Sequence, residues 1–205
     1  MDFLNIKRIV TSPHQENCYI VWDDTLKGAI IDPGGSVDKI TQHIEKNNIE
    51  VSAILMTHGH FDHIACADEL SHKYNVKVTV NEKEKAVIED GWNHSCFEFV
   101  NPSEYIFVKE NDIVKVGNME FKVIETPGHT IGSVCYLCDK SLLSGDTLFL
   151  QTVGRWDFFT GSFPELKNSV VNKLFLLPDD VKVYPGHGFT TMIGEEKIHN
   201  GIFAY

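Results

Sequence analysis

The stretch 57–63 constrains the fold of this chain more than any other. It reads Thr57-His58-Gly59-His60-Phe61-Asp62-His63, so four metal-competent side chains stand within six residues. The preceding residues 51–56 are almost entirely apolar and predict a buried strand. Side chains two apart on an extended backbone point to the same side, which places His58 and His60 together. The stretch therefore predicts metal-competent side chains presented where a buried strand ends.

Three later segments repeat this arrangement of a strand followed by a turn with a candidate ligand. His129 stands in the turn after residues 119–124, Asp146 follows residues 141–144, and His187 follows residues 181–184. Each segment alone is a weak signal, because Pro-Gly turns are common and a single histidine is usually an ordinary polar residue. Together with the first stretch they place five histidines and two aspartates just after predicted strands.

The remaining pattern predicts an α+β fold. Strands are expected at residues 6–10, 17–22, 28–31, 51–56, 77–80, 106–108, 113–116, 119–124, 134–137, 141–144 and 181–184. Helices are expected at 36–47 with Ser36 as N-cap, from Asp62 to about residue 74, from the capping residue Asn81 to about 91, at 163–176 and at 194–200. Gly117 and Asn118 supply a hairpin turn. Strands, then a helix, then a strand with ligands occur once in each half, which indicates two mixed sheets flanked by helices.

Size and charge restrict the classes of function. The chain has 205 residues and a formal charge of −11, and it shows no domain boundary, so a single domain over residues 1–205 is expected. An acidic surface gives no counterion-release drive toward nucleic acid and no attraction to anionic membranes. No apolar run is long enough to span a bilayer and no signal peptide is evident, which predicts a cytoplasmic protein.

The cysteines do not indicate a disulfide framework. There are five, an odd number scattered along the chain. Cys135 and Cys138 form a C-x-x-C, but they lie in a predicted strand, where residues three apart face opposite sides. We expect reduced thiols in the core.

The order of these motifs resembles the metallo-β-lactamase superfamily, and within it the glyoxalase II-like hydrolases. The resemblance runs from the turn at residues 32–35 to residues 194–196 and implies an αββα sandwich with the site at its edge. It implies that His58, His60 and His129 hold a first metal ion, that Asp62, His63 and His187 hold a second, and that Asp146 bridges both. The bridging Asp146, with His63, differs from the dizinc β-lactamases, which have Cys or Ser at the bridging position.

The chemistry of such a site agrees with these residues. Two metal ions about 3.5–4 Å apart form the usual hydrolytic pair. A water bridging them would become a hydroxide near neutral pH and attack a carbonyl polarised by one ion. Asp62 and Asp146 are the candidate catalytic carboxylates, and Asp62 could also take up or orient the proton. Zinc is the expected metal, with iron and manganese as alternatives, because mixed His and carboxylate ligands suit all three.

A thioester is the expected substrate class. A thiolate with a pKa near 8.5 leaves without a strong general acid, and the motifs contain no dedicated one. The resemblance points to S-acylglutathione thioesters such as S-D-lactoylglutathione, but the C-terminal helical region with which full-length glyoxalase II grips glutathione is expected to be missing. Arg155 either anchors a substrate carboxylate or pairs internally, and the sequence leaves both open. Trp156, Phe158 and Phe159 are interpreted as packing residues.

Other interpretations stay open at this point. The second hypothesis is a mononuclear iron oxygenase of the persulfide dioxygenase type, which would use the positions of His58, His129 and Asp146. An RNA-processing relative of the same fold is disfavoured by the charge of −11. Residues 92–105 mix aromatic and polar residues without a clear period and predict either a lid or an ordinary surface loop. The oligomeric state is undetermined.

Overall fold

Two six-stranded sheets form the centre of the molecule in the computed structural model, which describes residues 4–89 and 105–204. The first sheet contains, in spatial order, β1 (Asn5–Val10), β2 (Asn17–Trp22), β3 (Lys27–Ile31), β4 (Glu50–Leu55), β5 (Val78–Asn81) and β6 (Tyr105–Val108). The second contains, in spatial order, β14 (Thr191–Met192), β13 (Lys182–Pro185), β10 (Ser141–Gly145), β9 (Val134–Cys138), β8 (Met119–Glu125) and β7 (Ile113–Val116). Both sheets mix parallel and antiparallel pairs, as predicted.

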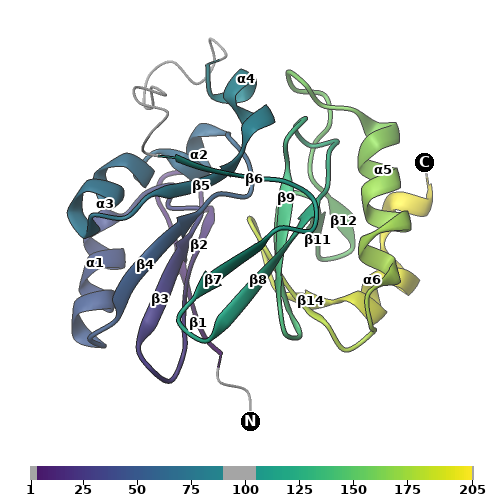
Figure 1. Cartoon of the computed structure of the whole chain (residues 1–205). Coiled ribbons are helices and arrows are strands. Elements are labelled where there is room, and N and C mark those ends of the chain that lie inside the picture. The colour runs from purple at the N-terminus through teal and green to yellow at the C-terminus, as the bar shows by residue number, and fades with distance from the viewer. Residues whose placement is uncertain (1–3, 90–104, 205) are drawn as a thin grey trace.

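Helices cover the outer faces of both sheets. Figure 1 shows α1 (Val37–Lys46) and α3 (Ala67–Tyr74) beside the first sheet, and α5 (Phe163–Asn172) and α6 (Ile193–His199) beside the second. The remaining short elements are α2 (Phe61–Ile64), η1 (Glu82–Glu84), α4 (Lys85–Ile88), the ribbon β11 (Leu148–Phe149) and β12 (Thr152–Val153), η3 (Leu174–Leu176) and η4 (Gly201–Ala204). The architecture is the αββα sandwich expected from the sequence.

Three apolar clusters hold these four layers together. One lies between the first sheet and its helices, one between the two sheets, and one between the second sheet and its helices. Within β9, Cys138 belongs to the cluster between the sheets and Cys135 to the cluster under the helices. The C-x-x-C therefore spans both faces of a strand, and its two cysteines are buried and form no disulfide, as expected.

The strands that precede the candidate ligands end at one edge of the sandwich. In the first sheet, β3, β4, β5 and β6 run parallel, so the residues that follow them meet at one edge. In the second sheet, β10 and β13 are parallel neighbours, which brings the residues after them together. Parallel pairing thus explains why residues far apart in the sequence converge.

The predicted helix from Asp62 to residue 74 is wrong as a single element. It is interrupted at Ala65 and Cys66, between α2 and α3. The backbone N–H of Cys66 donates to the carbonyl of Pro33 at 2.9 Å, so it is not available for a helical bond to Asp62. A Cβ on Gly34 would lie 1.5 Å from the Asp62 carbonyl oxygen, which shows how closely the turn after β3 crosses here.

Two smaller expectations also need correction. Ser36 is the N-cap residue of α1, as predicted, but it adopts a left-handed conformation with φ of 56° and its side chain makes no capping bond. Helix α5 ends at Asn172, and a separate 3-10 turn follows, so the predicted helix 163–176 is two elements. Asn81, in contrast, accepts a capping bond from the N–H of Lys83, and the hairpin at Gly117 is confirmed.

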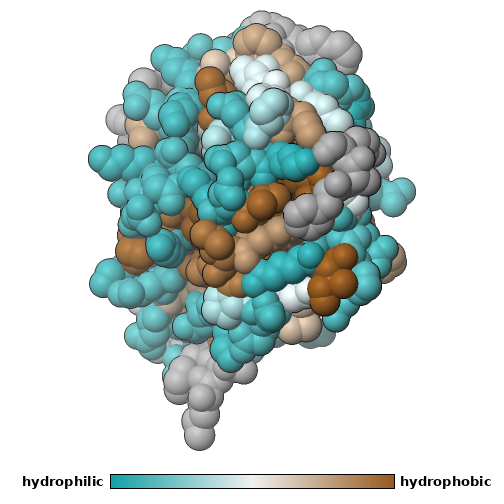
Figure 2. Space-filling view, turned by 90° about the vertical axis from the view of Figure 1, so that its right-hand side faces the viewer, coloured by the Kyte–Doolittle hydropathy of each residue, from teal (hydrophilic) through white to brown (hydrophobic). Residues whose placement is uncertain are grey.

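The surface on the α5 and α6 side carries apolar residues in patches between hydrophilic ones (Figure 2). Leu176, which follows α5, is 77% exposed, and Ile198, on α6, is 73% exposed. No helix within the described residues is long and apolar enough to cross a membrane. Of the predicted lid or loop at 92–105, all but Tyr105 lie outside the described residues.

Candidate metal centre

Three histidines from both sheets form the first ligand group. His58 and His60 follow β4, and His129 follows β8. One ring nitrogen from each lies within 4.8 Å of the others, and Nε2 of His58 is 3.2 Å from Nε2 of His129. The structure therefore brings together the three residues that the sequence assigned to the first metal ion.

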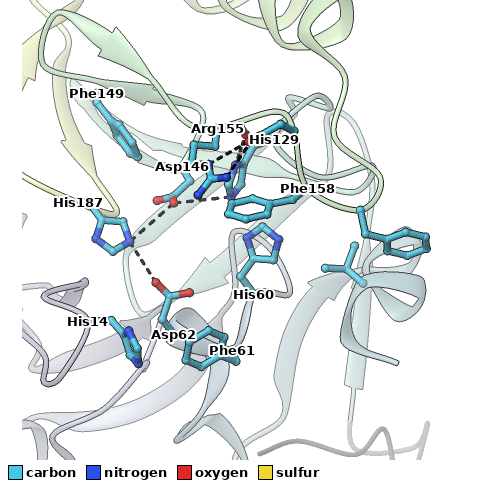
Figure 3. A pocket seen from close by; sticks show the side chains of 13 residues that line it. His14, His60, Phe61, Asp62, His129, Asp146, Phe149, Arg155, Phe158 and His187 are labelled. Atoms are coloured by element: carbon cyan, nitrogen blue, oxygen red, sulfur yellow. Dashed lines mark hydrogen bonds and ion pairs between the residues drawn. The ribbon is translucent and has the colours of Figure 1, made fainter. Parts of the chain in front are cut away.

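The second group also takes residues from both sheets. Asp62 and His63 lie on α2, and His187 follows β13. One ligand atom from each lies within 4.8 Å of the others, and His187 Nε2 is 3.2 Å from Asp62 Oδ2. Figure 3 shows Asp62 and His187 facing each other across the pocket.

Asp146 lies between the two groups. Its Oδ1 is 3.4 Å from His63 Nε2 in the second group, and its Oδ2 is 3.6 Å from His129 Nε2 in the first. The same Oδ2 is 3.7 Å from His187 Nε2. Each carboxylate oxygen thus faces ring nitrogens, which is the arrangement a bridging carboxylate requires.

Buried hydrogen bonds fix the orientation of the three inner imidazoles. Thr57 donates its hydroxyl to Asp32 Oδ2 at 2.6 Å, so its oxygen accepts from Nδ1 of His58 at 3.0 Å. Nδ1 of His63 donates to the same Asp32 oxygen at 3.0 Å, and Nδ1 of His129 donates to the carbonyl of Arg155 at 2.6 Å. With Nδ1 as the donor, Nε2 of each ring carries a lone pair and points into the site.

These lone pairs fit a bound cation. Nε2 of His58 and Nε2 of His129 face each other at 3.2 Å with no proton between them when both rings are neutral. His63 Nε2 and Asp146 Oδ1 are buried and have no hydrogen-bond partner among the described residues. Unpaired buried polar atoms are costly, and a metal ion between them would satisfy them. The donor set of imidazole nitrogens and carboxylate oxygens suits zinc, iron or manganese.

The protonation tendencies agree with this fit in the first group. Burial and the neighbouring histidines lower the pKa of His58, and the same causes lower the pKa of His60 to about 3. Both rings are therefore neutral and able to bind a metal. Burial alone would raise the pKa of Asp146, but the nearby His63 and His129 outweigh it and the pKa is lowered.

The second group is held differently. Burial works against a charged His63, but Asp146 and Asp32 outweigh it and raise its pKa, and Asp62 likewise raises the pKa of His187. Without a cation the neighbouring carboxylates favour a proton on these two rings, and Nε2 carries the lone pair described above only once that proton is gone. A metal ion would take the place of that proton.

Close backbone approach makes room for the ligands. A Cβ on Gly186, directly before His187, would lie 2.3 Å from Asp146 Oδ1 and 2.6 Å from a ring carbon of His63. A Cβ on Gly154 would lie 1.8 Å from the Asp146 carbonyl. Any larger residue at these positions would displace Asp146, so glycine is required for the geometry of the site.

A pocket of about 530 Å³ opens onto the ligands. Beyond the ligands its walls are largely aromatic, from Phe61, Phe149, Phe158 and Phe159. The interpretation of Phe158 and Phe159 as packing residues is therefore wrong, since both line the pocket. Trp156 turns the other way and packs in the cluster under α5, as expected.

Arg155 lies at the rim of this pocket with its charge already paired. Its Nε and Nη2 each donate to a different oxygen of Asp157 at 2.9 Å. Its guanidinium carbon lies 4.0 Å from the centroid of the Phe158 ring. Of the two roles that the sequence left open, internal pairing is the one present here, and a substrate carboxylate would have to compete with Asp157.

Sequence reasoning missed Asp32, Thr57 and Glu84. Asp32 was read only as part of a turn, although it follows the buried strand β3 at the ligand edge, and that position was the available signal. Thr57 is adjacent to the first histidine. Glu84 had no signal in the sequence, because its partners at positions 59, 130 and 132 come from two distant segments.

The αββα fold and the metal-competent site define a class of protein, the metal-dependent hydrolases with this sandwich architecture. Comparison with known proteins agrees with that class. The family model of the metallo-beta-lactamase superfamily matches residues 11–187. The chain belongs to the metallo-β-lactamase superfamily.

Individual relatives extend over nearly the whole chain. A hydroxyacylglutathione hydrolase, GloC, from Haemophilus influenzae is 35% identical, covering 96% of this chain and 97% of that protein. Among solved structures, the BLEG-1 B3 metallo-beta-lactamase superposes with a TM-score of 0.90 at 33% identity, covering 98% of this chain and 100% of that one. TTHA1623 in a di-iron-bound form gives a TM-score of 0.84 at 28% identity, covering 95% and 98%.

Proposed function

We propose that this protein is a binuclear metal-dependent thioesterase that hydrolyses S-acylglutathione-type thioesters such as S-D-lactoylglutathione. The observation that carries the proposal is the position of Asp146 between two three-residue ligand groups. The similarity to a hydroxyacylglutathione hydrolase along the whole chain supports the substrate class.

The proposed ligands divide as the sequence suggested. His58, His60 and His129 would hold the first ion, Asp62, His63 and His187 the second, and Asp146 both. Two bound divalent ions would supply an acidified water and would polarise the thioester carbonyl. The metal is proposed to be zinc, with iron as the alternative that the di-iron form of TTHA1623 supports.

The protein's own residues then bind and orient the reactants. Burial alone would raise the pKa of Asp62, but the hydrogen bond from His187 and the charge of His63 outweigh it, so Asp62 is ionised. As a carboxylate it can accept a hydrogen bond and orient a proton donor at Oδ2, which faces the pocket beside His187. The aromatic walls bind apolar parts of the substrate and exclude water. The thiolate leaves without a general acid because it is a weak base.

A second candidate rests on two residues of the first group together with Asp146. His58, His129 and Asp146 form a compact three-residue set. His129 Nε2 lies 3.2 Å from His58 Nε2 and 3.6 Å from Asp146 Oδ2. That set would suffice for the single iron of a persulfide dioxygenase-like oxygenase. The complete second group beside it favours two ions.

Metal analysis combined with a substrate panel tests the proposal. We expect about two metal ions per chain and hydrolysis of at least one glutathione thioester. The panel includes a β-lactam, because of the likeness to BLEG-1, and glutathione persulfide with oxygen-uptake measurement. One metal ion per chain without thioester turnover contradicts the proposal, and iron with persulfide-dependent oxygen uptake favours the second candidate.

A further inference from the structure

Glu84 is a fully buried carboxylate that belongs to neither ligand group. It lies in η1, directly after β5. Its Oε1 accepts hydrogen bonds from the hydroxyl of Thr130 at 2.7 Å and from the N–H of Gly132 at 2.7 Å. Its Oε2 accepts from the N–H of Gly59 at 2.5 Å. Three donors thus converge on one side chain.

These donors come from the two segments that carry the first ligand group. Gly59 lies between His58 and His60, in the segment after β4 of the first sheet. Thr130 directly follows His129, in the segment after β8 of the second sheet. A single carboxylate therefore joins the two sheets at their edge, where the three histidines of the first ligand group follow β4 and β8.

Glycines on both sides make the contact feasible. A Cβ on Gly59 would lie 3.0 Å from Glu84 Oε2 and 2.7 Å from Cγ1 of Ile88. A Cβ on Gly132 would lie 2.7 Å from Glu84 Oε1 and 2.8 Å from the Glu84 backbone nitrogen. The close approach of Glu84 thus requires glycine at position 59, between the two histidines, whether or not the turn itself also requires it.

The arrangement is costly for the protein. Burial raises the pKa of Glu84 to about 7 despite the three donors, and no basic side chain among the described residues offsets the burial. An apolar residue would pack here without that cost, but it would leave the N–H groups of Gly59 and Gly132 without this acceptor. The carboxylate holds both segments at a defined separation, which an apolar residue would not do.

We propose that Glu84 is a positioning residue for the first metal ion, because it sets the separation between the segment of His58 and His60 and the segment of His129. This inference rests on the two metal ions of the proposed function. It predicts that a substitution at Glu84 lowers the affinity for the first metal ion and leaves the affinity for the second unchanged.

The test compares Glu84→Gln with Glu196→Gln. Glutamine keeps the size but turns one acceptor oxygen into a donor, which then faces N–H or O–H groups. Glu196 is equally buried and also accepts three hydrogen bonds. They come from the backbone N–H of Gln151, the hydroxyl of Thr191 and the side-chain amide of Asn200. None of these partners is a candidate ligand or next to one, so Glu196→Gln is a matched control for buried-carboxylate loss.

Metal affinity is the readout. The two dissociation constants are measured by competition with a chromogenic chelator, and His60→Ala and His187→Ala identify which constant belongs to which ion. We expect Glu84→Gln to weaken the first ion about 10–100-fold, as loss of groups that orient ligands typically does. The second ion in Glu84→Gln, and both ions in Glu196→Gln, should stay within about threefold of the wild type on the same principle.

Each outcome decides the matter. Wild-type constants in Glu84→Gln, or an equal loss of both ions, overturn the inference while leaving the proposed function intact. A wild-type chain that binds no metal overturns both. If circular dichroism shows that Glu84→Gln does not fold, Thr130→Val, which removes one of the three hydrogen bonds, takes its place. A weaker first ion in Thr130→Val then supports the inference, and two unchanged constants overturn it.

Discussion

Asp23 is a buried carboxylate that ties the two sheets together away from the candidate ligands. In the turn between β2 and β3 its Oδ1 accepts from the N–H and hydroxyl of Thr25 and from the N–H of Lys27. Its Oδ2 accepts from the N–H of Asn118 at 2.6 Å, in the hairpin between β7 and β8. Burial raises the pKa of Asp23, but these hydrogen bonds outweigh it and the pKa is lowered.

Replacing Asp23 with Asn should therefore destabilise the protein in a pH-dependent way. The folded pKa lies below the unfolded value near 3.9, so this contribution is present at neutral pH and is lost as pH falls through the folded pKa. We expect Asp23→Asn to lower the free energy of unfolding by about 1.5–3 kcal/mol at pH 7, with the difference narrowing below about pH 4. Urea unfolding over a pH series measures it.

The neighbouring Asp24 provides the control. It is exposed and makes one longer hydrogen bond of 3.3 Å, to the Asn118 side chain. Asp24→Asn should change the free energy of unfolding by less than about 0.5 kcal/mol at any pH. If the free energies of unfolding of the wild type and Asp23→Asn differ by the same amount at pH 3 and pH 7, the argument is contradicted.

Asp146 is the residue whose loss should separate folding from activity. Asp146→Ala removes the carboxylate that faces both ligand groups. We expect thioesterase activity to fall at least about 100-fold, more than for loss of a residue that only orients a ligand. Far-UV circular dichroism should be retained. Asp180→Ala, at an exposed residue paired with Lys140, is the control and should keep full activity. Near-wild-type activity of Asp146→Ala would refute the bridging role.

At the scale of elements, the residue after each strand matters as much as the strand. Gly186 directly follows β13 and lies so close to Asp146 and His63 that a methyl group cannot be placed there without moving a ligand. Helix α2 is a single turn for a similar reason, because the turn after β3 takes the hydrogen bond that would continue it. Strand ends are thus shaped by the neighbouring segments that meet them at the same edge.

Gly186→Ala should consequently impair metal binding more than folding. Its Cβ would approach Asp146 Oδ1 to 2.3 Å, whereas a Cβ on Gly201 would meet its nearest atom, a backbone oxygen, at 3.5 Å. We expect Gly186→Ala to weaken binding of at least one metal ion about tenfold or more, as misplaced ligands typically do. Gly201→Ala should match the wild type in metal titrations. Equal affinities in both variants would show that the site adapts to the methyl group.

At the scale of the molecule, the proposed ligands connect the two sheets. His58, His60, Asp62 and His63 belong to the first half of the chain, and His129, Asp146 and His187 to the second. Bound metal ions would therefore join the halves and stabilise only the folded state, since the unfolded chain does not bring these residues together.

Removing the metal should lower the melting temperature. At a free metal concentration of about 1,000 times the dissociation constant, one site contributes about 4 kcal/mol. For a chain of this size that corresponds to a decrease of roughly 8–16 °C on removal of one ion. Thermal unfolding before and after chelation, and after metal is restored, measures it. An unchanged melting temperature despite confirmed metal loss would show that the metal ions do not stabilise the fold by joining the two halves of the chain.

Much of the fold could be predicted because it depends on local pattern. Alternating and continuous apolar runs identify the strands of both sheets, and the motifs after them identify the candidate ligands. The two-residue strands β11, β12 and β14 were missed, because so short a segment has no period to detect. The division of α2 from α3 was missed because its cause lies in a backbone contact with residues 33 and 34.

The sequence by itself determined which residues are competent to bind metal and that each follows a strand, since side-chain chemistry and hydrophobic period are local properties. Only the tertiary structure decided how they meet. Parallel pairing brings the strand ends to one edge, Asp32 and Thr57 orient the rings, and Glu84 joins the two segments of the first group. These contacts with Asp32 and Glu84 join residues that are 25 to 48 positions apart, and no local pattern encodes such a distance.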